Sequence, residues 1–265
     1  MTTAIIGAGV MGETLLSGLL RAGVPKSELL IADRRIERSA EVTKEHGVAN
    51  GTNQEVSANA DTVVLVVKPQ DMAIVLDEIK DSLRPGTLVV SLAAGITTGF
   101  MEDLLPAKTP VIRVMPNTPA LVDQGMAAIS SGTNSTEEHL VTVETLLRSV
   151  GQVVRVPEKY QDAVTAISGS GPAYIFYVVE AMIEGGVMLG LPRDVANELV
   201  LQTVYGAATM LRETNEHPTV LREQVTSPGG TTVAALRQFD DFKVRAAFLS
   251  AMEAARDRSK ELGMQ

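Results

Sequence analysis

The sequence contains no cysteine, and its only histidines are widely separated, at His46, His139 and His217. The absence of cysteine excludes disulfide bonds and thiolate metal sites, and it fits a reducing compartment. Because no other candidate ligand stands at metal-binding spacing from these histidines, we expect surface histidines and no metal site. The net charge of −9 disfavours a nucleic-acid partner, which would need a concentrated basic surface.

Long apolar runs and targeting signals are also missing. No run approaches the ~20 residues that span a bilayer. Residues 2–6 lead directly into a glycine-rich loop, so they are typical of a first strand and not of a signal peptide. We therefore expect a soluble, cytoplasmic protein without a membrane partner. The 265 residues, 45% of them hydrophobic, are enough for a sizeable core and predict two domains.

The first part of the chain alternates short apolar runs with helical patterns. The apolar runs are continuous, which is typical of a parallel sheet covered by helices on both faces. Residues 1–157 are therefore predicted to form a doubly wound α/β domain of the Rossmann type, which binds dinucleotides. The predicted strands are residues 3–6, 29–32, 62–67, 88–92, 111–115 and 152–156, with helices at about residues 11–22 and 36–45.

Residues 158–265 show helical periodicity and no convincing strand. The segment from Tyr174 to Leu189 is apolar nearly all round, so most of its faces must be buried. Two explanations stay open: a second subunit covers this helix, which we favour, or the helix is the core of a self-contained bundle. We predict an all-helical domain that carries the substrate site and forms a homodimer.

The glycine-rich loop after the first strand has the pattern Gly-x-Gly-x-x-Gly. Because it follows a strand and opens a helix, this pattern favours a dinucleotide site over a turn without a ligand. Gly7 permits the tight turn, Gly9 admits the pyrophosphate, and Gly12 allows the helix to pack closely. The helix N-terminus offers unpaired N–H groups to the phosphates. The predicted contacts in this loop are Gly7, Ala8, Gly9, Val10, Met11 and Gly12.

The end of the second strand gives conflicting signals about the cofactor. Asp33 stands 21 residues after Gly12, where a carboxylate grips the ribose of NAD. Arg34 and Arg35 follow at once, and a guanidinium there can hold the 2′-phosphate of NADP. We favour NADP(H), with Arg34 as the contact, because two adjacent cations outweigh one carboxylate that is free to turn away. Use of NAD(H) stays open. It also stays open that Arg34 and Arg35 are only the solvated start of a helix and contact no cofactor.

Three further segments follow predicted strands at the carboxyl edge of the sheet, where ligands bind. Small residues and prolines there leave room for the nicotinamide and fix the loop shape. Lys68 is interpreted as a catalytic acid or, more simply, as a residue that contacts the cofactor ribose or lies at the surface. The predicted cofactor contacts in these segments are Val67, Lys68, Pro69, Ala93, Ala94 and Asn117.

A second cluster of glycines and hydroxyls lies at residues 225–232. A glycine pair lets backbone amides approach an anion closely, and the neighbouring hydroxyls can bond a small polar substrate. The alternative is a loop with a helix cap. Together the two glycine clusters predict a reductase of a small carboxylate compound. At Ser168–Gly171 the hydrolase pattern Gly-x-Ser-x-Gly is broken, so we expect the variant Ser170→Ala to stay active.

With these segments assembled, the chain resembles the pyrroline-5-carboxylate reductase family over essentially its whole length. The resemblance implies reduction of 1-pyrroline-5-carboxylate to L-proline with NAD(P)H, the last step of proline biosynthesis. It also implies a Rossmann domain, helices that interleave in a dimer, and dimers that in some members assemble into decamers. The segments that carry it are residues 7–12, 67–69, 91–95, 115–119, 168–174 and 227–232.

The resemblance also implies roles for particular residues. It places Asn53 at the adenosine part of the cofactor and Glu158 at the substrate. On chemical grounds we predict that the Thr232 hydroxyl bonds the ring nitrogen of the imine. The backbone amides of Gly230 and Thr231, with the Ser227 hydroxyl nearby, are predicted to hold the substrate carboxylate.

Three other functions stay open. A 3-hydroxyacid dehydrogenase or another imine reductase would share the architecture, although residues 172–189 lack the lysine on which such dehydrogenases rely. A dinucleotide-binding regulator without catalysis would keep residues 7–12 but need not keep the second cluster. The sequence does not distinguish the five-membered ring from a piperideine carboxylate.

Overall fold

The computed structural model describes residues 1–263, and the contacts within it divide the chain into two units. The N-terminal unit comprises Met1–Ser170 and the described residues from Ala254 onward, and the helical unit comprises Gly171–Glu253. This division falls later than residue 157 because Gln161 is buried and bonds to Ala128 and Ser130 of the sheet. The domain bounds 1–157 and 158–265 stay a prediction.

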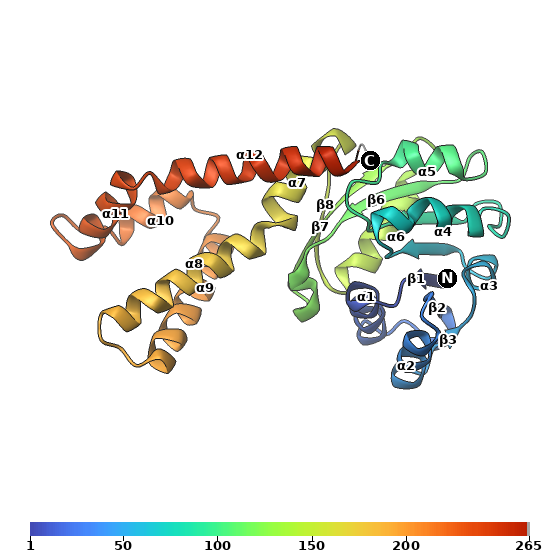
Figure 1. The fold of residues 1–265 in the computed structure, drawn as a ribbon, viewed down its shortest axis with the longest axis horizontal. Helices are drawn as coiled ribbons and strands as arrows, with labels where there is room; N and C mark the ends of the chain where they lie inside the picture. Colours follow the sequence, from blue (N-terminus) through green and yellow to red (C-terminus); the bar gives the residue numbers. More distant parts are fainter. Residues whose placement is uncertain (264–265) are drawn as a thin grey trace. The chain divides into compact units, whose positions relative to one another are not determined.

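The N-terminal unit is built on an eight-stranded sheet with the order β3-β2-β1-β4-β5-β6-β7-β8 (Figure 1). All neighbouring strands are parallel except β6 and β7, which pair antiparallel. The carboxyl ends of β1, β2 and β4 therefore meet at one edge. The strands are β1 (Thr3–Ile6), β2 (Leu29–Ala32), β3 (Ala49–Asn50), β4 (Thr62–Leu65), β5 (Leu88–Ser91), β6 (Val111–Met115), β7 (Gly125–Ser131) and β8 (Gly151–Arg155).

Helices cover both faces of this sheet. One buried apolar layer joins the sheet to α1 (Val10–Arg21), α2 (Ile36–His46) and α6 (Glu137–Arg148). The layer on the other face joins it to α3 (Asn53–Ala58), α4 (Met72–Ile79) and α5 (Thr98–Leu104). This arrangement confirms the predicted doubly wound Rossmann-type fold. Shorter helical segments are η1 (Lys26–Glu28), η2 (Pro69–Asp71), η3 (Thr118–Val122), η4 (Glu158–Tyr160), α7 (Gln161–Val164) and the π-helical η5 (Thr165–Gly169).

Two strands were missing from the sequence prediction. β3 contains only Ala49 and Asn50, which is too short for a periodic pattern. β7 reads Gly-Met-Ala-Ala-Ile-Ser-Ser, and its glycine, alanine and serine residues have little β propensity. Pairing with β6 and β8 on both sides stabilises β7 in spite of its composition.

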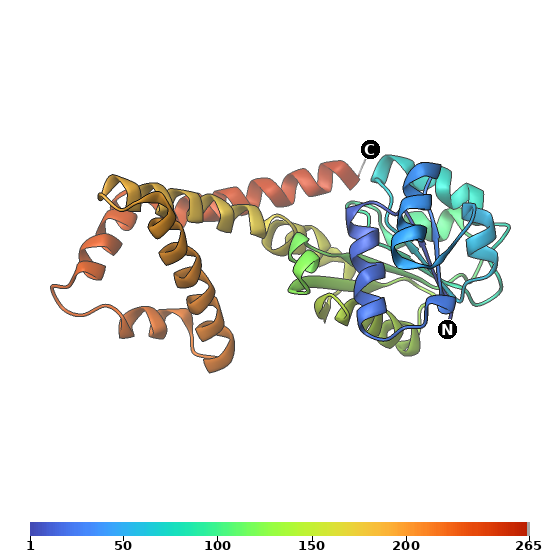
Figure 2. The ribbon, with the colours of Figure 1, turned by 90° about the horizontal axis from the view of Figure 1, so that it is seen from below.

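The helical unit contains helices and no strand, as does the whole described chain from Glu158 to Gly263. Helices α8 and α9 pack along each other (Figure 2). The helices are α8 (Gly171–Met188), α9 (Arg193–Thr214), α10 (Pro218–Gln224), α11 (Thr231–Asp241) and α12 (Val244–Gly263), the last of which ends in the N-terminal unit.

The surface of the helical unit is strongly apolar within a single chain. Helix α8 has no buried residue, and its Phe176 and Tyr177 are 65% and 75% exposed. An apolar hollow of about 370 Å³ opens between Tyr174 and Tyr177 on α8 and Phe248 on α12. The alternative in which α8 is the core of a self-contained bundle is therefore wrong.

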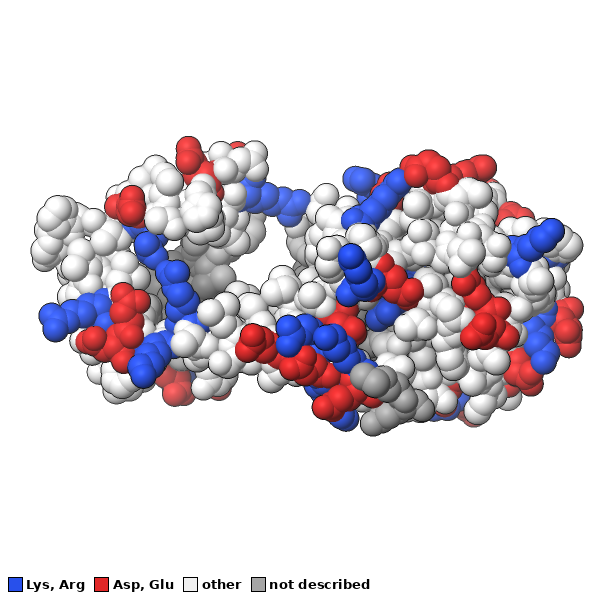
Figure 3. Space-filling view, turned by 90° about the horizontal axis from the view of Figure 1, so that it is seen from above, with Lys and Arg blue, Asp and Glu red and all other residues white. Residues whose placement is uncertain are grey.

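One helical segment, Glu158–Met188, passes the length and composition test for a membrane span, which corrects our expectation that none would. Sequence inspection missed it because Glu180 and Glu184 interrupt the apolar run. Charged side chains of both signs are interspersed over the face of the N-terminal unit in Figure 3.

Candidate functional site

The glycine loop between β1 and α1 has the geometry of a phosphate cradle. Gly7 has φ +104°, and a Cβ there would overlap the Val66 carbonyl oxygen. A Cβ on Gly12 would overlap the Gly7 carbonyl oxygen, so the helix packs closely against the loop. Gly9 faces open space and begins α1 without a side-chain cap, which leaves the first N–H groups of the helix unpaired within it. The loop therefore has room for an anion.

A cavity of about 270 Å³ opens beside this loop. It brings together residues from the carboxyl ends of β1, β2 and β4 with the start of α3, as a dinucleotide site at a strand edge requires. Pro69 follows the lining residue Lys68 in the chain and is the first residue of η2. The lining residues are Ile6, Gly7, Gly9, Asp33, Arg34, Arg35, Asn53, Val66, Val67, Lys68, Asp71 and Val75.

Asp33 is held in place and is not free to turn away, contrary to the sequence-based argument. Its side chain is 6% exposed and accepts hydrogen bonds from the Ala8 N–H at 2.9 Å and from Arg35 Nε at 3.1 Å. Burial alone would raise the pKa of Asp33, but hydrogen bonds from the Arg35 side chain and from the N–H groups of Arg35 and Ala8 outweigh it and lower the pKa.

Arg34 and Arg35 have different surroundings, although they are neighbours. Arg35 is occupied by the Asp33 carboxylate. Arg34 is 72% exposed and makes one ion pair, with Asp71 at 3.2 Å. Asn53, on the same cavity, donates to Glu78 at 2.7 Å. Arg34 is thus the more available guanidinium for a phosphate.

A network behind the glycine loop was missed by the sequence reasoning. Arg38 Nε donates to the Ala8 carbonyl oxygen at 2.8 Å, and Arg38 also pairs with Glu13. His46 Nε2 lies 3.2 Å from Glu13 Oε1. Burial would raise the pKa of Glu13, but hydrogen bonds with His46 and Arg38 outweigh it and lower the pKa. Arg38 lies in the first turn of α2, where a cation is unfavourable beside the positive end of the helix dipole. This unusual position was the signal in the sequence that Arg38 has a specific partner.

The three histidines have structural partners. His139 and His217 accept backbone N–H bonds at the starts of α6 and α10. His46 is only 15% exposed, so the expectation of a surface residue is wrong for it, because it packs against Glu13. Glu13, Glu45 and His46 offer ligand atoms within 4.8 Å of one another. The Arg38 guanidinium already neutralises Glu13 in this group.

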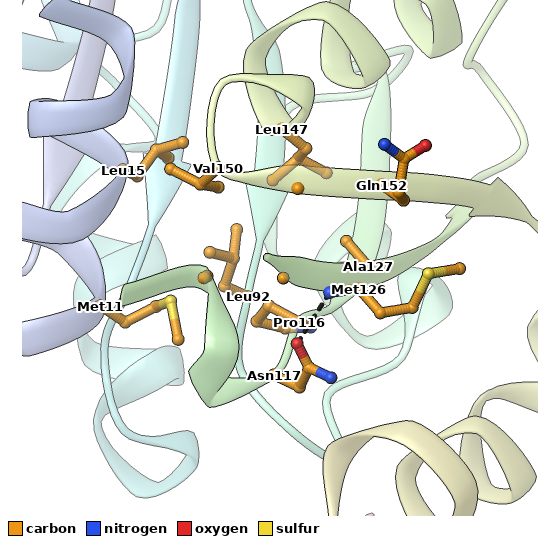
Figure 4. A pocket seen from close by; sticks show the side chains of 13 residues that line it. Met11, Leu15, Leu92, Pro116, Asn117, Met126, Ala127, Leu147, Val150 and Gln152 are labelled. Carbon is orange, nitrogen blue, oxygen red and sulfur yellow. Dashed lines mark hydrogen bonds between the residues drawn. The ribbon is translucent and has the colours of Figure 1, made fainter. Parts of the chain in front are cut away.

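Asn117 lies at a second, narrow hollow of about 10 Å³ that also touches Met11 and Leu92 (Figure 4). Its Oδ1 accepts from the Met126 N–H at 2.7 Å, and its Nδ2 donates to the Ser168 carbonyl oxygen at 3.2 Å. These bonds tie the start of β7 to η5. Ala93 and Ala94 lie in the loop after β5, and the Ala93 N–H donates to Ser91 Oγ at 3.2 Å.

Glu158 has protein partners for both carboxylate oxygens. Oε1 accepts from the Thr98 N–H at 2.7 Å, and Oε2 accepts from Thr98 Oγ1 at 2.6 Å. The buried Arg113 donates to Oε1 at 3.4 Å. Glu158 therefore satisfies the start of α5 and compensates a buried guanidinium.

The second glycine cluster forms the turn between α10 and α11. Gly229 has φ +71°, and Gly230 begins α11 without a side-chain cap. A Cβ on Gly230 would lie 2.5 Å from Ser227 Oγ, so only glycine lets this hydroxyl approach. The Gly230 N–H donates to the Ser227 carbonyl oxygen at 3.0 Å. Thr231 and Thr232 follow as the first residues of α11, where N–H groups have no intrahelical acceptor.

The fold and the cavity beside the glycine loop are those of a Rossmann-type protein of the kind that binds dinucleotides. Residues 2–95 match the family described as NADP oxidoreductase, coenzyme F420-dependent. Residues 158–262 match the family described as pyrroline-5-carboxylate reductase dimerisation. A pyrroline-5-carboxylate reductase of Corynebacterium melassecola is 46% identical over 99% of this chain and 98% of its own length. The chain belongs to the pyrroline-5-carboxylate reductase family.

Solved structures agree with this assignment over the full length. A pyrroline-5-carboxylate reductase of Coxiella burnetii has a TM-score of 0.93 and 37% identity, covering 98% of each chain. The Plasmodium falciparum pyrroline carboxylate reductase with NADP bound has a TM-score of 0.87 and 30% identity, covering 99% of this chain and 98% of its own. The dimerisation match covers α8, so association of subunits through the C-terminal region explains its exposed apolar surface.

Proposed function

We propose that this chain reduces 1-pyrroline-5-carboxylate to L-proline, the last step of proline biosynthesis. The carrying observation is the uncapped start of α11, where Gly230, Thr231 and Thr232 offer an anion site in a chain with a dinucleotide cavity. The names of the relatives support the substrate. We also propose that residues 1–157 form the cofactor domain and residues 158–265 the substrate and dimerisation domain.

The chemistry needs a hydride acceptor that is held and polarised. The bound nicotinamide supplies the hydride for the imine carbon. The Thr232 hydroxyl donates a hydrogen bond to the ring nitrogen, which draws electron density away from the imine carbon and makes that carbon a better hydride acceptor. The nitrogen then takes up one proton from water, which completes the secondary amine of proline. Thr232 is one residue inside α11, where the positive end of the helix dipole favours an anionic substrate.

The substrate carboxylate has several predicted donors around the same turn. The Thr231 N–H is unpaired within α11, and the Ser227 hydroxyl lies against Gly230. The predicted donation by the Gly230 N–H competes with its bond to the Ser227 carbonyl oxygen. Substrate contact by Glu158 competes in the same way with Thr98 and Arg113.

We propose NADP(H) as the preferred cofactor, with NAD(H) as the second candidate. The Asp33 carboxylate already accepts hydrogen bonds from Ala8 and Arg35, so fewer of its lone pairs can accept bonds from ribose hydroxyls. Arg34 is exposed at the same cavity and suits a 2′-phosphate. Asn53, Val67, Lys68, Pro69, Ala93, Ala94 and Asn117 are the proposed remaining contacts.

We propose that the chain works in the cytoplasm as a homodimer formed by its C-terminal helices, and a decamer of such dimers is a second possibility. The exposed Phe176 and Tyr177 on α8 and Tyr205 on α9 supply apolar surface for this contact.

Two substitutions of Thr232 and one control substitution, at Ser170, test the role of Thr232. We expect Thr232→Ala to lose about 100-fold in kcat/KM for the imine, because a donor to the reacting group is removed. Thr232→Ser should recover much of this loss, and Ser170→Ala should stay close to the parent. NADPH affinity, measured by titration calorimetry, should be unchanged in all three. Equal turnover by Thr232→Ala and the parent would contradict the role.

A further inference from the structure

The backbone of Ala8 is held at its N–H and at its carbonyl oxygen by two side chains outside the glycine loop. Asp33 accepts from the Ala8 N–H at 2.9 Å, and Arg38 Nε donates to the Ala8 carbonyl oxygen at 2.8 Å. Ala8 itself is 1% exposed, so neither group exchanges readily with water. These two bonds fix the orientation of the backbone at the point where the loop turns into α1.

The Ala8 carbonyl that Arg38 holds is part of the Ala8–Gly9 peptide, and the orientation of that peptide matters for a bound phosphate. In a trans peptide the C=O and the following N–H point in opposite directions. Because the Ala8 carbonyl points toward Arg38, the Gly9 N–H points away from Arg38. Gly9 lines the cavity and has nothing within 4 Å at its Cβ position.

Arg38 is itself fixed by carboxylates. It pairs with Glu13, one turn into α1, and with Glu41 at 3.3 Å. His46 holds the other oxygen of Glu13 at 3.2 Å. Only 24% of the Arg38 side chain is exposed, so its guanidinium has little freedom. Removing it would release the Ala8 carbonyl.

We propose that Arg38 is a positioning residue for the cofactor: it holds the Ala8 carbonyl so that the Gly9 N–H faces the pyrophosphate. This inference rests on the proposed use of a dinucleotide. It separates two neighbouring arginines by function. Arg34 serves the 2′-phosphate, which only NADPH carries, whereas Arg38 serves the pyrophosphate, which NADPH and NADH share.

Titration calorimetry on the full-length chain tests the separation with NADPH, NADH and adenosine 2′-monophosphate, which lacks the pyrophosphate. We expect Arg38→Ala to weaken both dinucleotides by the same factor, roughly tenfold, because one charge-assisted hydrogen bond is lost. Its affinity for adenosine 2′-monophosphate should stay unchanged. Arg34→Ala should weaken NADPH and adenosine 2′-monophosphate and leave NADH unchanged. Lys44→Ala, which removes an exposed cation from the same helix that has no part in this network, should match the parent.

Arg38→Lys is a second variant in case Arg38→Ala does not fold. The lysine ammonium still neutralises Glu13, but it cannot also replace the hydrogen bond that Arg38 Nε donates to the Ala8 carbonyl oxygen. We expect it to weaken both dinucleotides as well. In steady-state assays the KM for both cofactors should rise, with kcat within about twofold of the parent. Parental dinucleotide affinity in folded Arg38→Ala and Arg38→Lys would overturn the inference. The inference would also be overturned if Arg38→Ala lost as much affinity for adenosine 2′-monophosphate as it lost for the dinucleotides. A parent chain that binds NADPH without reducing the imine would contradict the proposed function, and the affinities would still decide on Arg38.

Discussion

The strands of the N-terminal unit and helix α8 of the helical unit have similarly apolar sequences, yet one chain buries only the strands. Every residue of β1, β4 and β5 is buried, whereas α8 has no buried residue. The strands are covered by helices of the same chain, and α8 lies in the region that matches the dimerisation family. Apolar sequence therefore predicts burial, but it does not say which molecule supplies the cover.

The largest expected effect separates the two kinds of apolar surface. We expect Phe176→Asp to convert the proposed homodimer into monomers and to abolish reductase activity, because a charge would enter the proposed apolar interface. Light scattering after size-exclusion chromatography measures the mass. Ile74→Asp is the matched control, since Ile74 is 61% exposed on α4 of the N-terminal unit. If Phe176→Asp stayed a dimer with parental activity, Phe176 would not lie in the subunit interface.

The core of the N-terminal unit should respond differently. Leu76 on α4 is 0% exposed within the buried layer. We expect Leu76→Ala to lower the free energy of unfolding by about 2–5 kcal/mol, because a cavity replaces packed methyl groups. Urea denaturation followed by circular dichroism gives the value, and the dimer mass should not change. A loss well below 1 kcal/mol would show that this layer is not close-packed.

The strand pattern was predictable where one residue type dominates. β1, β2 and β6 begin and end at the predicted residues, because β-branched and leucine side chains fill a sheet covered on both faces. β7 was not predictable, since its small residues carry no periodic signal and only its neighbours β6 and β8 hold it in the sheet.

The glycine loop was predictable because its backbone demands are local, as the positive φ of Gly7 illustrates. The partners of side chains were not. Asp33 looked free in sequence, but the fold brings the Ala8 N–H and Arg35 onto it. Arg38 reaches Ala8 across 30 residues of sequence, and only the packing of α2 beside the loop makes that contact.

The smallest expected effect is acid sensitivity of the N-terminal unit. The pKa values of Glu13 and Asp33 lie below their ordinary values of 4.5 and 3.8. Stability from such groups is complete above the ordinary pKa and is lost as pH falls through the lower folded pKa. We expect the unfolding free energy to fall between about pH 5 and pH 3, and to fall less in Glu13→Gln. Urea titrations at each pH measure it, and an equal decline in Glu13→Gln would argue against the Glu13 contribution.

The most direct test of the account is the loss of reduced-nicotinamide absorbance when 1-pyrroline-5-carboxylate is added to the chain, run in parallel with NADPH and NADH. We expect rapid oxidation with proline as the product, faster at low cofactor concentration with NADPH than with NADH. Folded protein that binds NADPH and oxidises neither cofactor in the presence of the imine would contradict it.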